Sequence, residues 1–133
     1  MFEFGISLIV IIILVWIYLI FYYKWYKKLQ KNRLDYYKSL VSKTDSGQIS
    51  LKEKIITFDK IYHNILKESG YKWSFWEILK KKPSVIWDIN KIWELHKSRN
   101  VLVHQIETSD EKKLSKQSIN YKEEILDLLK KLG

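Results

Sequence analysis

Cysteine and alanine are absent from this chain of 133 residues, which has one proline and four glycines. Without cysteine the chain forms neither a disulfide framework nor a thiolate metal site, and a reducing compartment poses no difficulty for it. No segment shows the alternation of apolar and polar residues that is typical of a half-buried strand, and no glycine-rich phosphate loop is present. The sequence therefore predicts an all-α protein without a cofactor.

Charged residues are also missing between Glu3 and Lys24. The apolar run from Phe4 to Tyr23 is long enough to cross about 30 Å of hydrocarbon as one helix. No basic residue precedes the run and no small-residue cleavage site follows it, which argues against a cleaved signal peptide. We therefore expect a single-pass membrane helix at Phe4 to Tyr23.

Basic residues follow the apolar run directly, whereas its other flank has only Glu3. These basic residues are Lys24, Lys27, Lys28, Lys31 and Arg33. Because basic flanks remain on the cytoplasmic side, the pattern predicts a plasma-membrane protein with its N-terminus outside and its C-terminal domain in the cytoplasm. The same five residues would then contact anionic lipids.

The chain divides into three parts by composition. Residues 1–23 form the expected anchor, 24–48 a basic juxtamembrane helix that continues to about Val41 and ends in a linker, and 49–133 a bundle of about four helices. Two capping boxes, Ser50 to Glu53 and Ser74 to Glu77, mark helix starts in the last part. Residues 24–133 contain 24 basic and 14 acidic residues, a net charge of +10, which favours a polyanion such as RNA as a partner.

The segment from Leu95 to His104 sets a polar R-N-x-x-x-H group into an apolar helical repeat that begins near Trp87. Burying such side chains is costly unless each is paired or used. Apolar residues on two flanks of this helix predict a place in the middle of the bundle. Ile89, Ile92 and Trp93 lead into the polar group, as a dimer seam would.

The R-N-x-x-x-H run, on a late helix of a small helical domain, resembles the R-x(4 to 6)-H motif of the HEPN superfamily (higher eukaryotes and prokaryotes nucleotide-binding). The phrase I-W-E-L-H-K-S-R-N-V-L-V-H resembles a group of short, N-terminally membrane-anchored bacterial proteins with such a domain. The likeness covers roughly residues 49–133. It implies a metal-independent endoribonuclease acting as a homodimer, with Arg99 and His104 as the catalytic pair and Asn100 as an accessory residue. Other members keep the fold without cleaving RNA.

The residue types suit RNA cleavage by attack of the 2'-hydroxyl on the adjacent phosphate. An imidazole such as that of His104 exchanges protons near neutral pH, and the guanidinium of Arg99 stabilises the extra negative charge of the transition state. His96, one turn before Asn100, either orients that amide or is a satisfied core histidine. His96 and His104 are too far apart, without a cysteine or carboxylate between them, to suggest a zinc site.

Other interpretations of the motif remain open. Arg99, Asn100 and His104 would equally suit a hydrogen-bonded polar layer that fixes helix register. The chain would then be a non-catalytic module that holds RNA, a nucleotide or a protein at the membrane, or a structural membrane protein. Lys80 to Lys82 suit RNA contact or a solvated helix end, and Trp87 and Trp93 suit base stacking or the core.

Overall fold

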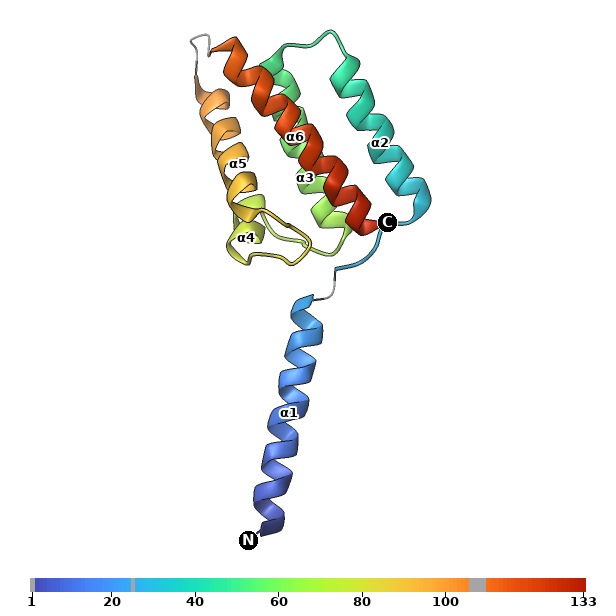
Figure 1. Cartoon of the computed structure of the whole chain (residues 1–133), viewed down its shortest axis with the longest axis vertical. Helices are drawn as coiled ribbons and strands as arrows, with labels where there is room; N and C mark the ends of the chain where they lie inside the picture. The colour runs from blue at the N-terminus through green and yellow to red at the C-terminus, as the bar shows by residue number, and fades with distance from the viewer. Residues whose placement is uncertain (1, 25, 106–109) are drawn as a thin grey trace.

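The computed structural model describes residues 2–24, 26–105 and 110–133, and within these ranges every regular element is a helix (Figure 1). The elements are α1 (Phe2–Lys24), α2 (Lys31–Ser46), α3 (Leu51–Glu68), α4 (Phe75–Lys80), α5 (Ile89–His104) and α6 (Glu111–Leu132). Helices α2, α3, α5 and α6 pack into a bundle, with the short α4 at one end. The predicted helical bundle is confirmed.

Helix α1 extends away from the bundle (Figure 1). The prediction of a membrane span at Phe4 to Tyr23 is wrong, because no helix in the described ranges is both long and apolar enough to cross a bilayer. The predicted single-pass plasma-membrane location, which depended on that span, is wrong as well.

The chain does not continue as one helix to Val41 as expected. Residues 26–30 are not helical, and two backbone hydrogen bonds fix this segment to the bundle. The Lys27 amide donates to the Ser69 carbonyl (2.7 Å), and the Leu29 amide donates to the Leu132 carbonyl (3.0 Å). Helix α2 then starts afresh and buries Tyr37 in the common core. The packed unit therefore includes residues that composition alone assigned to a juxtamembrane helix and linker.

Arg33 pairs with Glu68 at the end of α3. Its Nε donates to Glu68 Oε2 (3.0 Å), its Nη2 pairs with Glu68 Oε1, and the Tyr37 hydroxyl donates to the same Oε1 (2.7 Å). These contacts dock the start of α2 on the end of α3. Lys27, Lys28 and Lys31 are exposed, and the side chain of Lys24 lies outside the described residues.

Helix α3 lies in the middle of the bundle, where it contacts α2, α5 and α6 (Figure 1). Its buried apolar residues are Ile55, Phe58, Ile61, Tyr62, Ile65 and Leu66. The prediction that the motif helix α5 holds the middle position is wrong, because polar residues in its last two turns narrow its apolar face. Helix α5 buries only Ile92, Leu95, His96 and Leu102, and it covers one side of α3.

Both predicted capping boxes are confirmed. The Ser50 hydroxyl accepts from the Glu53 amide (3.2 Å) while the Glu53 carboxylate accepts from the Ser50 amide (2.9 Å), and Ser74 and Glu77 repeat the pattern at α4. Each box satisfies backbone groups that a helix start leaves without partners. The second box fixes where α4 begins and so places the aromatic side chains around it.

Glu68→Gln should loosen α2, because the neutral amide no longer pairs with the Arg33 guanidinium. Hydrogen bonds from Arg33 and then Tyr37 hold the pKa of Glu68 below its ordinary value of 4.5. The ionised carboxylate therefore stabilises the fold at neutral pH, and this contribution is lost as the pH falls below about 4.5. We expect faster hydrogen exchange of α2 amides at pH 7, and a smaller loss of stability on acidification than in the parent.

Glu94→Gln is the matched control, since the Glu94 pair with Lys97 is exposed. Equal exchange rates for the Glu68 and Glu94 variants would show that the Arg33 pair does not hold α2 in place.

Candidate functional site

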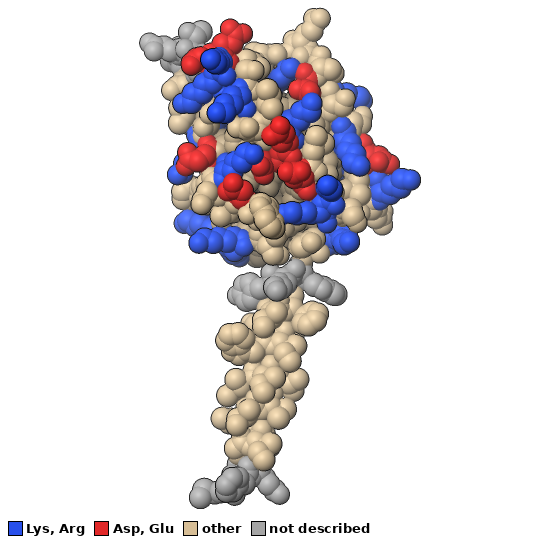
Figure 2. All heavy atoms as spheres, in the orientation of Figure 1, with Lys and Arg blue, Asp and Glu red and all other residues tan. Residues whose placement is uncertain are grey.

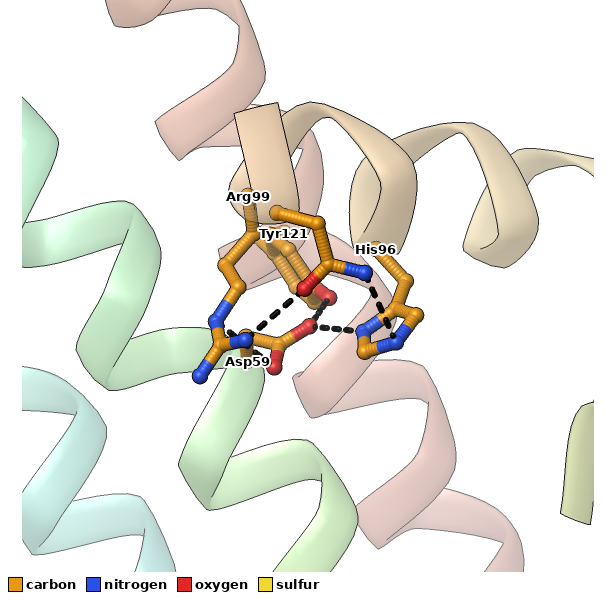
Figure 3. A network of polar contacts seen from close by, with 5 residues as sticks. Asp59, His96, Arg99 and Tyr121 are labelled. Atoms are coloured by element: carbon orange, nitrogen blue, oxygen red, sulfur yellow. Dashed lines mark hydrogen bonds and ion pairs between the residues drawn. The ribbon is translucent and has the colours of Figure 1, made fainter. Parts of the chain in front are cut away.

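A single carboxylate joins α3, α5 and α6 (Figure 3). Asp59 on α3 is only 4% exposed. Its Oδ1 accepts a hydrogen bond from the Tyr121 hydroxyl of α6 and lies 2.8 Å from His96 Nδ1 of α5. Its Oδ2 lies 3.4 Å from Arg99 Nε. Three helices thus meet at one buried negative charge.

The donors and acceptors around Asp59 form one consistent chain. Because an ionised carboxylate only accepts, His96 donates from Nδ1, and its Nε2 is then free to accept from the Asn100 amide nitrogen at 3.4 Å. The Asn100 amide oxygen in turn accepts from Arg99 Nη1 at 2.8 Å. The chain satisfies both ring nitrogens of His96 and gives Asn100 a fixed orientation.

Arg99 is held in this chain with part of its guanidinium accessible. Its Nε is buried and lies at ion-pair distance from Asp59 without hydrogen-bond geometry. Its side chain is 25% exposed. Among the described residues, Nε is the only buried side-chain nitrogen or oxygen without a hydrogen bond. Nη2 has no hydrogen bond there either, so it is not buried and reaches the surface. Figure 3 shows one guanidinium nitrogen directed away from the other side chains.

His104 is exposed at the end of α5, and none of the polar contacts among the described residues joins it to Asp59, Arg99 or Asn100. His104 is five positions after Arg99 in the helix, which turns the two side chains about 140° apart around the helix axis. Of the predicted site residues, the structure therefore brings Arg99, Asn100 and His96 together. It does not bring His104 to Arg99 within one chain.

Sequence reasoning missed Asp59 and Tyr121. Asp59 is an acid between Phe58 and Ile61, on the face that α3 buries. A charged residue at core spacing needs a partner, which was the available signal. Tyr121 follows the apolar repeat of α6, but its hydroxyl needs a partner once buried, which was the signal there.

Burial controls the ionisation of the tyrosines here. Burial and the neighbouring Asp59 carboxylate raise the pKa of Tyr121 well above its ordinary value of 10.0, so its hydroxyl stays a donor to Asp59. Burial likewise raises the pKa of Tyr62, which packs edge-on against the Tyr121 ring. Among the described residues, no group of three or more His, Asp or Glu side chains is placed to hold a metal ion.

No family model, curated protein or solved structure matches this chain. The resemblance to the HEPN superfamily therefore depends on the R-N-x-x-x-H run and its helical setting, and it stays a prediction.

Asp59→Asn should destabilise the fold by about 3 kcal/mol, since it leaves the Arg99 cation without a counter-charge in a largely buried site. Tyr121→Phe removes one hydrogen bond and should cost about 1 kcal/mol. Denaturant unfolding followed by circular dichroism measures both changes.

Adding Arg99→Met to Asp59→Asn removes the unpaired cation and should recover part of the lost stability. A stability of Asp59→Asn within about 0.5 kcal/mol of the parent would mean that Asp59 does not balance the Arg99 charge.

Proposed function

We propose that this chain is an RNA-binding protein of the HEPN type that cleaves RNA without a metal ion as a homodimer. The observation that carries the proposal is the state of Arg99: Asp59 and Asn100 fix it, while its Nη2 reaches the surface. A guanidinium held in advance loses little freedom on meeting a phosphate, which is what transition-state stabilisation requires. His104 adds an exposed proton-transfer group to the same helix.

The reaction needs only these two kinds of group. A histidine removes the proton from the 2'-hydroxyl, the 2'-oxygen bonds to the adjacent phosphorus, and the bond from phosphorus to the 5'-oxygen breaks. The departing 5'-oxygen takes up a proton from a protonated histidine, which leaves a 2',3'-cyclic phosphate and a free 5'-hydroxyl. Arg99 balances the charge that builds up on the phosphate oxygens between these states.

A second copy of the chain is part of the proposal, because Arg99 and His104 of one copy point in different directions. In a two-fold dimer, His104 of one protomer can face Arg99 of its partner. Of the expected seam residues, Ile92 is fully buried, whereas Ile89 and Trp93 are partly buried against the core, so little of the seam is open to this contact. Val101 and Val103 are exposed beside the motif and are the apolar residues that such a contact would cover.

A second candidate is a HEPN-like module that binds RNA without cleaving it. The observation that favours it is Asp59, whose negative charge offsets that of Arg99. A phosphate then meets a well-placed hydrogen-bond donor with a reduced net charge, which suits binding more than catalysis.

His104→Ala should reduce cleavage of mixed RNA in EDTA by 100- to 10,000-fold, the usual range for a proton-transfer group. Arg99→Lys keeps a positive charge beside Asp59 but loses the planar fork, so it should also reduce cleavage while the protein stays folded. Gel analysis of RNA fragments and their 2',3'-cyclic ends measures both effects, and Lys116→Ala on the exposed surface of α6 is the control. An EDTA-treated parent that leaves RNA intact would favour the non-cleaving module.

Mixing the Arg99→Lys and His104→Ala proteins tests the dimer. If each cleft takes Arg99 from one protomer and His104 from the other, random exchange should restore activity to about a quarter of the parent level. The RNA assay after subunit exchange measures the gain. No gain, together with a monomeric parent in sedimentation at high concentration, would exclude a shared cleft.

A further inference from the structure

The bundle has a surface of paired tryptophan and lysine side chains that the proposed reaction does not use. Four of the six tryptophans lie within residues 73–93, and each has a lysine ammonium over its ring. The pairs are Trp73 with Lys81, Trp76 with Lys80, Trp87 with Lys131 and Trp93 with Lys97. Figure 2 shows basic side chains along the lower left of the bundle, where Figure 1 places α4.

Two of these rings form a common site. Trp76 of α4 and Trp93 of α5 pack edge to face, with 4.4 Å between their centroids. With Asn90, Glu94 and Lys97 they line a shallow open pocket of about 350 Å³. Trp76 is half exposed, so an aromatic surface remains open to solvent beside two lysines.

The pocket continues along α5 to the motif. Trp93, Lys97, Asn100 and His104 follow one another at steps of four, three and four residues. These steps place the four side chains within an arc of about 60° and over about 16 Å of helix. We call this row the α5 stripe; it begins at the aromatic pocket and ends at the exposed histidine.

We propose that the α5 stripe is the path of single-stranded RNA, with a base stacked at Trp76 and Trp93 and the following phosphates passing Lys97 toward His104. This inference rests on the proposed function and names the form of RNA that the site takes. Open aromatic rings next to ammonium groups match the bases and phosphates of a single strand, whereas a duplex hides its base faces. The one acid in the pocket, Glu94, is 3.5 Å from Lys97 and competes with a phosphate for it.

The test measures binding apart from cleavage, with the full chain and a 2'-O-methylated oligouridine that has no attacking hydroxyl. Fluorescence anisotropy should show that Trp76→Leu and Trp93→Leu each weaken binding about tenfold. Lys97→Ala should weaken it and reduce the salt dependence by about one phosphate contact. Glu94→Gln should strengthen it. Trp93→Phe, which keeps an aromatic ring, should retain binding. It shows whether weaker binding of Trp93→Leu comes from the lost ring or from unfolding.

Trp87→Leu is the matched control, because Trp87 is 90% exposed and pairs with a lysine of α6, away from the stripe. Equal effects of Trp87→Leu and Trp93→Leu would overturn the proposal. It would also be overturned if the parent bound heparin or duplex RNA as tightly as the oligonucleotide. Binding of anionic lipid vesicles but not of the oligonucleotide would replace RNA by a lipid surface.

Oligonucleotide binding that needs Trp76 and Trp93, with no cleavage of unmodified RNA, would keep the path and reject the nuclease. Cleavage with an unchanged KM in both tryptophan variants would keep the nuclease and reject the path.

Discussion

The buried charge of Asp59 is the constraint on which the rest of the bundle depends. A carboxylate taken out of water is costly unless it is paired and hydrogen-bonded, and Asp59 receives Tyr121 from α6 and both His96 and Arg99 from α5. Apolar contacts alone tolerate several registers between helices. A shift of α5 by one residue would carry His96 and Arg99 away from the carboxylate, so the polar contacts select one register.

The same contacts shape the candidate site. Asp59 gives Arg99 a fixed position and at the same time reduces the net charge that Arg99 offers to a phosphate. His96 lies beside Asn100 in the motif, and in the structure its two ring nitrogens link Asp59 to Asn100. In the proposed function, the groups that meet RNA are the accessible edge of Arg99 and the exposed His104, and the α5 stripe leads to His104.

Local signals in the sequence predicted much of the bundle. The capping boxes at Ser50 and Ser74 are confirmed because the interactions that make them lie within four residues. Contacts between distant residues were not predictable in this way. The pairing of Arg33 with Glu68 docks α2 on the bundle, and Asp59 contacts side chains of α5 and α6. The apolar run at Phe4 to Tyr23 shows a different limit. Hydropathy indicated an apolar segment long enough for a span, whereas no helix in the described part of the chain is both long and apolar enough to cross a bilayer.

The two backbone hydrogen bonds of the segment at residues 26–30 also have a mechanical consequence. They join the chain that follows α1 to the ends of α3 and α6, the two helices that share the most contact in the bundle. Tension applied through α1 would therefore be transmitted to α3 and α6 before it reached α2, although α2 comes next in the chain. A pull on α1 would thus act first on α3 and α6, the two helices in closest contact, and only then on α2.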